Sequence, residues 1–138
     1  CIRDRSENRR KQLEMTSGTH RVYGWAKKYG IKTAFGTDVL FSPKLAKREG
    51  KNLAKLKRWY TPFEVLKMAT HDNAELFKMC GPRNPYAKGD LGIVSAGAYA
   101  DLILVEGDPL IDIDLIADPE RNFRIVMKDG KVYKNTLK

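Results

Sequence analysis

The sequence predicts a mixed α/β fold: the first eighty or so residues are helical around one buried strand, and the last fifty are mostly β. Three observations predict it. Apolar residues repeat at helical spacing before Gly30, the run IKTAFGTD from Ile31 to Asp38 has strand composition, and an Asp-Gly pair joins two apolar runs near the C-terminus. Because the composition changes near Asn84, we place a domain boundary between residues 1–83 and 84–138.

The composition is that of one globular domain, with 138 residues, of which 42% are hydrophobic and 9% aromatic. Its apolar stretches are too short to span a bilayer, so we expect no membrane partner. Two cysteines without CxxC spacing argue against a disulfide scaffold and are compatible with a reducing compartment. The chain opens with CIRDRS and not with Met, so we expect a piece of a longer protein. Its localisation stays open, because a targeting signal would lie upstream.

Two helices are expected before the strand. The first runs from Asp4 to about Met15, and the polar stretch from Thr16 to Thr19 predicts a break or a new N-cap. Gly30 ends the second helix. The second helix is amphipathic, and its predicted buried face carries Val22, Trp25, Ala26 and Tyr29.

A cationic helix is expected after the strand. Val39 to Pro43 is predicted to be a loop, because Ser-Pro disfavours a continuing helix. Lys44 to Tyr60 then forms the helix, with Gly50 as a weak point. The apolar side of this helix carries Leu45, Leu53, Leu56 and Tyr60.

Thr61 opens a further helix with a strong start signal. Thr is the N-cap, Pro62 occupies the first helical position and Glu64 the third, which is the pattern of a capping box. Thr70 is expected to start the next helix, which ends at Gly81-Pro82. His71 would then lie in a first turn, and we assign it no catalytic role.

Strands are expected in the C-terminal part. Asp101 to Val105 is a strand candidate that ends before Gly107-Asp108-Pro109, and Ile111 to Pro119 is a looser connection. The runs Phe123 to Met127 and Lys131 to Tyr133 flank Asp129-Gly130, which predicts a hairpin.

Asp38 is the first candidate for a functional residue, since it closes a buried strand that lies between helices. In barrels of alternating strands and helices, catalytic groups lie at the carboxyl ends of the strands. The alternative from spacing alone is an Asp that caps a turn or the next helix.

The net charge of +9, from 26 Lys and Arg against 17 Asp and Glu, raises nucleic acid or another phosphate as a partner. The lysine-rich segment 44–58 would make that contact, although aromatic residues suited to base stacking are few there. A charged helix face is more often only solvated, so we do not expect nucleic acid to be a partner.

Four segments, taken in order, resemble the C-terminal end of the amidohydrolase superfamily. They are FGTD from Phe35, TPFEVLKMAT from Thr61 running into DNAELF, LGIVSAGAYADLILVEGDPL from Leu91, and VMKDGKVYKN from Val126. The resemblance is greatest to the imidazolonepropionase-like and Xaa-Pro or Xaa-Arg dipeptidase branch.

The resemblance implies the C-terminal part of a metal-dependent (β/α)8 barrel hydrolase plus the C-terminal strands of its small β-sandwich. Residues 31–37 would be the eighth barrel strand, and residues 91–133 would belong to the sandwich. It also implies that Asp38 is both a metal ligand, most often to one or two zinc ions, and the acceptor of a proton from the water that attacks the C–N bond. The substrate would be a small peptide-like or cyclic amide, and the substrate-binding residues are unknown.

The other metal ligands of the superfamily have no counterpart in this chain. Zinc needs about three or four protein ligands, so we expect the chain alone to hold no catalytic metal and to be inactive. We expect homo-oligomers, because apolar surface would be exposed. Two further hypotheses stand beside the enzyme: a basic phosphate-binding module that uses segment 44–58, whose affinity would fall steeply with salt, and a purely structural domain.

Overall fold

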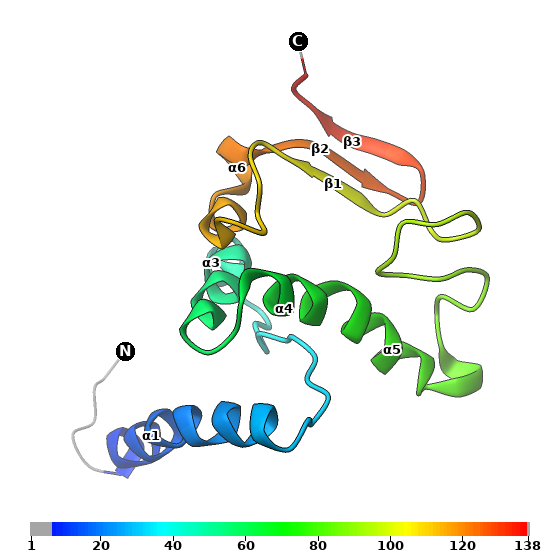
Figure 1. Ribbon diagram of the computed structural model, residues 1–138. Coiled ribbons are helices and arrows are strands. Elements are labelled where there is room, and N and C mark those ends of the chain that lie inside the picture. The colour runs from blue at the N-terminus through cyan, green and yellow to red at the C-terminus, as the bar shows by residue number, and fades with distance from the viewer. Residues whose placement is uncertain (1–6, 138) are drawn as a thin grey trace. The chain divides into compact units, whose positions relative to one another are not determined.

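The computed structural model describes residues 7–137 and divides the chain into two compact units, Cys1–Thr33 and Ala34–Lys138. The first unit holds the helix α1 (Glu7–Lys28), and the second holds all other elements (Figure 1). The predicted boundary between residues 83 and 84 lies inside the second unit and stays a prediction about domain layout. The predicted mixture of an early helical part and a late β part is confirmed.

The predicted helix break from Thr16 to Thr19 is wrong, because α1 is continuous through it. The hydroxyls in this stretch donate to carbonyls of the preceding turn: Thr16 Oγ1 to Gln12 O at 2.9 Å, and Thr19 Oγ1 to Met15 O at 3.2 Å. Bonding of this kind lets Ser and Thr stay inside a helix as well as cap one. The part of the first predicted helix before Glu7 lies outside the described residues.

The predicted stop of α1 at Gly30 is confirmed. Gly30 has φ +61°, its N–H donates to Lys27 O at 3.3 Å, and Ile31 N–H donates to Ala26 O at 2.9 Å, which together form a Schellman motif. The predicted buried face of this helix is wrong for the described chain. Ala26 is buried, but Trp25 is 53% exposed, and Val22 and Tyr29 are exposed as well.

The predicted strand from Ile31 to Thr37 is not a strand, since residues 31–41 have no regular secondary structure. A strand needs a hydrogen-bonded neighbour, and its apolar composition cannot replace one. The described residues offer helices here: Phe35 N–H donates to Asn73 Oδ1 at 3.0 Å and to Met68 O at 3.4 Å. The segment is thus attached to a helix where a sheet was expected.

The predicted cationic helix is broken into three short pieces, α2 (Pro43–Ala46), α3 (Glu49–Ala54) and the 3₁₀ turn η1 (Lys55–Arg58). The preceding loop is confirmed, and Ser42 caps α2. On the predicted apolar side, Leu45 is exposed, whereas Leu53, Leu56 and Tyr60 are buried.

Gly50 is a point of close packing and not the weak point that was predicted. A Cβ at this position would lie 2.1 Å from the backbone oxygen of Ile116, in the turn η4 (Ile113–Ala117). The glycine therefore lets the backbones of α3 and η4 approach each other, and Ile113 is only 2% exposed beside them.

The helix that Thr61 opens is confirmed as α4 (Pro62–Lys67), with the complete capping box. Thr61 N–H donates to Glu64 Oε2 at 2.7 Å, and Thr61 Oγ1 accepts from Glu64 N–H at 3.3 Å. The predicted helix start at Thr70 is wrong. A π-helical turn, η2 (Met68–Asp72), joins α4 directly to α5 (Asn73–Lys78), and Thr70 Oγ1 donates to Leu66 O at 2.8 Å. The predicted stop at Gly81-Pro82 is confirmed, since α5 ends before the 3₁₀ turn η3 (Gly81–Arg83).

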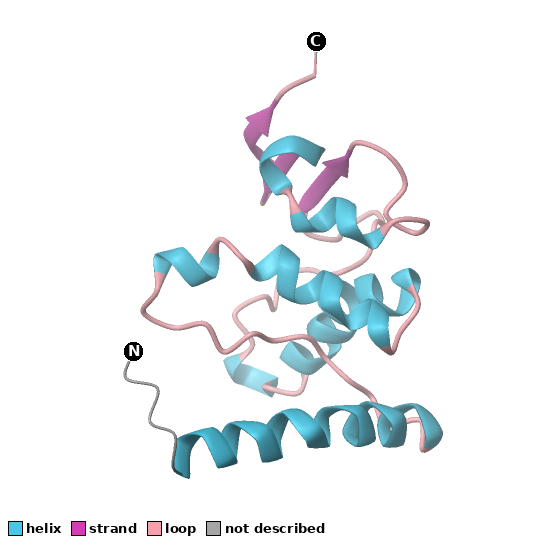
Figure 2. Cartoon of the chain, turned by 90° about the vertical axis from the view of Figure 1, so that its left-hand side faces the viewer, coloured by secondary structure: helices cyan, strands magenta, loops and turns pink. Residues whose placement is uncertain are grey.

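The C-terminal part forms an antiparallel sheet in the order β1-β2-β3. The strands, magenta in Figure 2, are β1 (Leu102–Val105), β2 (Phe123–Lys128) and β3 (Lys131–Asn135). The predicted hairpin is confirmed, with Asp129 (φ +50°) and Gly130 (φ +74°) in its turn. The predicted loose connection from Ile111 to Pro119 holds η4, and the short helix α6 (Pro119–Asn122) begins at its end.

The core of the second unit lies among the helices. Val65, which is fully buried, lies in α4, and the other buried residues of the unit are Leu53, Ala54, Leu56, Tyr60, Met68, Ala74 and Ile113. In the described residues, no helix is long and apolar enough to cross a membrane.

Candidate active site

Asp38 lies in the irregular segment after Thr37, and its side chain is exposed. Its φ of +51° places the backbone in the left-handed region, which residues other than glycine seldom adopt. Asp is one of the residues that tolerates this conformation best. The carboxylate is therefore at the surface, on a backbone that its surroundings hold in an unusual conformation.

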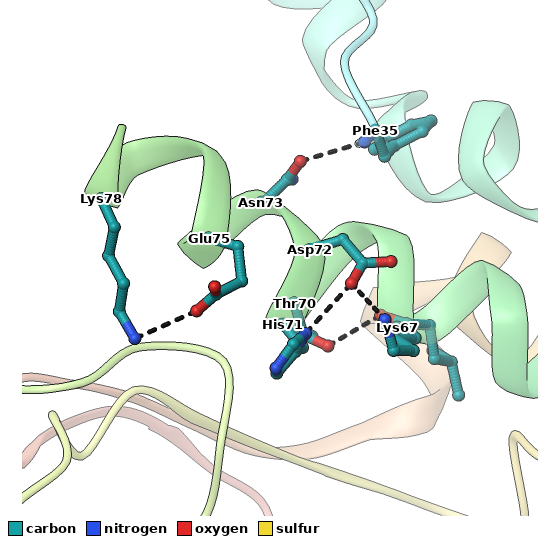
Figure 3. A network of polar contacts seen from close by, with 9 residues as sticks. Phe35, Lys67, Thr70, His71, Asp72, Asn73, Glu75 and Lys78 are labelled. Atoms are coloured by element: carbon teal, nitrogen blue, oxygen red, sulfur yellow. Dashed lines mark hydrogen bonds and ion pairs between the residues drawn. The ribbon is translucent and has the colours of Figure 1, made fainter. Parts of the chain in front are cut away.

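Two contacts hold the segment that leads to Asp38. Figure 3 shows Asn73, on α5, accepting the bond from the backbone nitrogen of Phe35. Thr37 Oγ1 donates to Glu49 Oε1, at the start of α3, at 3.3 Å. The segment just before Asp38 is thus anchored on α5 and on α3.

A polar network beside this anchor stabilises the π-helical turn. Asp72 accepts hydrogen bonds from the Lys67 ammonium and from His71 Nδ1, the latter at 3.0 Å (Figure 3). Desolvation of Asp72 acts to raise its pKa, but the bonds from Lys67 and His71 outweigh desolvation and lower it. His71, to which we assigned no catalytic role, thus takes part in a structural ion network.

The loop that begins LGIV packs directly on the π-helical turn. Gly92 has φ +72°, and a Cβ there would lie 2.6 Å from the backbone carbonyl of Thr70. Two of the quoted segments, TPFEVLKMAT and LGIVSAGAYADLILVEGDPL, therefore meet at this glycine. The two segments occur in one sequence for a packing reason, because only glycine fits at position 92 against the backbone of Thr70.

The described residues by themselves do not fit a metal ion. They contain no group of three or more His, Cys, Asp and Glu side chains that could hold one. Asp38 supplies one carboxylate, and zinc needs about three or four protein ligands. The role of Asp38 as a ligand stays a prediction.

The charge of the cationic segment is divided between paired and unpaired side chains. Lys57 pairs with Asp114, and Lys55 Nζ donates to Asn52 Oδ1 at 2.9 Å. Within segment 44–58, Lys57 alone enters one of the ion pairs found among the described residues. The other exposed cationic side chains of this segment are Lys44, Lys47, Arg48, Lys51, Lys55 and Arg58. A local excess of positive charge therefore follows Asp38 in the sequence.

Two surface hollows, of about 570 and 410 Å³, lie beside the loop 84–100 and do not include Asp38. Tyr99 lines the larger one and Tyr86 the smaller one. Phe77, Tyr86 and Tyr99 pack edge to face, with centroids 5.7 Å apart in each pair, and Lys128 Nζ lies 5.1 Å from the centre of the Tyr86 ring. These contacts tie the loop to α5 and β2.

Sequence reasoning missed the supporting residues of the site. Asn73 follows the TPFEVLKMAT segment in DNAELF, and no local pattern connects it to Phe35, which lies 38 positions earlier. The clue was the resemblance itself, because DNAELF is among the segments that carry it.

The comparisons with known proteins identify the family of the chain. The model of the protein family described as 'Amidohydrolase family' matches residues 6–134 of this chain. A comparison with the curated proteins found no match. The matching solved structures confirm the fold class that the resemblance implied, an α/β part of a barrel hydrolase.

Three solved structures show the similarity. An amidohydrolase is 30% identical with a TM-score of 0.72, over 86% of this chain and 26% of its own. A prolidase complexed with N-methylphosphonate-L-proline is 27% identical with a TM-score of 0.70, over 84% and 26%. The ochratoxinase of A. niger is 30% identical with a TM-score of 0.66, over 82% and 24%. The chain thus spans about a quarter of the length of these structures, and it belongs to the amidohydrolase family.

Proposed function

We propose that this chain is part of a metal-dependent hydrolase that cleaves an amide-type carbon–nitrogen bond in a small peptide-like or cyclic amide. The observation that carries the proposal is the match to the amidohydrolase family over residues 6–134. The similarity to a prolidase supports a peptide-like substrate.

Asp38 is the residue of this chain that we assign to the chemistry. Its carboxylate is exposed, its backbone is held in the left-handed region, and anchors on α3 and α5 fix the segment before it. A carboxylate in this position can accept a proton from a water molecule that attacks the amide carbonyl.

The metal in our proposal is a divalent ion, zinc. It would lower the pKa of its bound water toward neutrality and polarise the carbonyl of the substrate. Because Asp38 is one carboxylate and the described residues contain no group of three or more metal-ligating side chains, the remaining ligands would come from other parts of the enzyme.

The test is the variant Asp38→Asn in the zinc-loaded enzyme that carries this sequence. Asparagine keeps the size and the tolerance for a positive φ but cannot accept the proton, so kcat should fall by about 100-fold or more while the fold is retained. The matched control is Asp90→Asn, an exposed Asp whose ion pair with Lys78 lies on the loop 84–100. Turnover of Asp38→Asn near that of the wild type would remove Asp38 from the mechanism.

A further inference from the structure

Phe41 is the most unusual apolar residue of the described chain. Its φ is +60°, and its side chain is fully exposed, at 101% of the reference area. A bulky residue in the left-handed region costs free energy, and an exposed aromatic ring gives none back through burial. Neither feature stabilises the second unit through contacts within the described chain.

The conformation is imposed from both sides. On the N-terminal side of Phe41, the side chain of Thr37 is hydrogen-bonded to Glu49 at the start of α3. After it, Ser42 caps α2, because Leu45 N–H donates to Ser42 O at 3.0 Å and to Ser42 Oγ at 3.4 Å. Strained backbone of this kind persists only where the surroundings hold it, and it gathers at ligand-binding and catalytic positions.

Phe41 is also close to the residue assigned to catalysis. It follows Asp38 by three positions, so their Cα atoms lie at most about 11 Å apart. This separation is within the size of a dipeptide, so one substrate could contact both residues. The hollows near Tyr86 and Tyr99 include neither residue.

We propose that Phe41 is a specificity-determining residue, which contacts an apolar or aromatic group that flanks the scissile amide of the substrate. The inference rests on the proposed function and deepens it by naming the substrate class. The ring supplies an apolar contact of the kind that lines small-molecule sites, and its fixed backbone means that little conformational entropy is lost on binding.

The experiment compares the hydrolysis of three dipeptides, Ala-Ala, Ala-Phe and Phe-Ala, by the zinc-loaded enzyme that carries this sequence. The key variant is Phe41→Gly, because glycine adopts a φ of +60° without strain and removes the ring. Phe41→Tyr keeps the ring. Leu40→Ala is the matched control, since Leu40 is the exposed apolar neighbour whose φ is not positive.

We expect the wild type to prefer one of the two Phe dipeptides over Ala-Ala, measured as the ratio of kcat/KM. Phe41→Gly should lower that ratio by about tenfold, and Phe41→Tyr should retain it. Leu40→Ala should leave the ratio unchanged. The melting temperature of Phe41→Gly should equal or exceed that of the wild type, because the strain is relieved.

Each other outcome overturns a stated claim. If the wild type cleaves none of the dipeptides, the peptide-like part of the proposed function fails, and the inference fails with it. If the wild type cleaves all three with equal kcat/KM, the proposed function stands and the inference alone fails. If the wild type cleaves them and Phe41→Gly keeps the ratio, the inference alone fails. A lower melting temperature for Phe41→Gly, with the ratio intact, would show that the ring packs against protein instead of substrate.

Discussion

Several side chains of this chain occupy special backbone positions or hold a turn. Asp38 and Phe41 are exposed and pack against little, yet both hold a positive φ that their neighbours impose. Asp101 has a structural role, because its two carboxylate oxygens hold the turn of the β2–β3 hairpin. It accepts from Asp129 N–H at 2.7 Å and from Lys128 Nζ at 2.5 Å.

The hairpin makes stability depend on pH. The hydrogen bond from Lys128 and the one from the backbone of Asp129 lower the pKa of Asp101. A carboxyl whose pKa is lower in the folded state gives its stabilisation above the unfolded pKa and loses it as the pH falls through the folded pKa. The contribution of Asp101 should thus be complete at pH 7, begin to fall near the unfolded pKa of about 3.9, and vanish only below the lower pKa of the folded state.

Asp101→Asn measures this contribution. Urea unfolding at pH 7 should show a loss of about 1 kcal/mol, because a charged acceptor is replaced by a neutral one beside a half-exposed Lys128. The loss should become smaller as the pH is lowered below about 3.9, because the carboxylate of the wild type is then protonated progressively. A loss that stays equal as the pH is lowered would show that the carboxylate charge does not matter here.

At the scale of elements, two features that depend on neighbouring residues in the sequence were predicted correctly, and a strand that depends on distant residues was not. The capping box at Thr61 and the turn at Asp129-Gly130 are satisfied by residues a few positions away, so the sequence pattern predicted them correctly. The strand from Ile31 depends on neighbours, and the described chain supplies Asn73 and Met68 in their place. No pattern within the segment contains that information.

The same reasoning explains the errors inside helices. Hydroxyls at Thr16 and Thr19 can cap a new helix or bond back within one, and the pattern alone does not choose. At Gly50, the reason for glycine is the Ile116 carbonyl, which is 66 positions away. Asp38 was found by its place after an apolar run, whereas its anchors at Asn73 and Glu49 came only with the structure.

Gly50→Ala tests the packing of α3 against η4. The added Cβ would lie 2.1 Å from the Ile116 oxygen, so the backbones must separate, and unfolding in urea should show a loss of about 2 kcal/mol or more. Gly36→Ala is the control in the same unit, because nothing lies within 4 Å of its added Cβ. It should change stability by less than about 0.5 kcal/mol. Equal effects of the two variants would contradict the packing that we describe.

At the scale of the whole molecule, the chain belongs to the amidohydrolase family, and its described residues form no complete metal centre. It covers about a quarter of the length of the solved structures that it matches, and its described residues bring no three metal-ligating side chains together. The exposed apolar residues of α1 and of β1 and β3 leave surface that further protein can cover, which is the basis of the expected self-association. We therefore propose the hydrolase activity for an enzyme of which these 138 residues are one part.

Zinc content, measured by mass spectrometry on the purified chain after dialysis, tests the central claim most directly. If Asp38 is one ligand of a centre that other residues complete, the chain alone should retain far less than one zinc ion per molecule. One or more tightly held zinc ions per chain would contradict the account, because the described residues would then build a metal site without outside help.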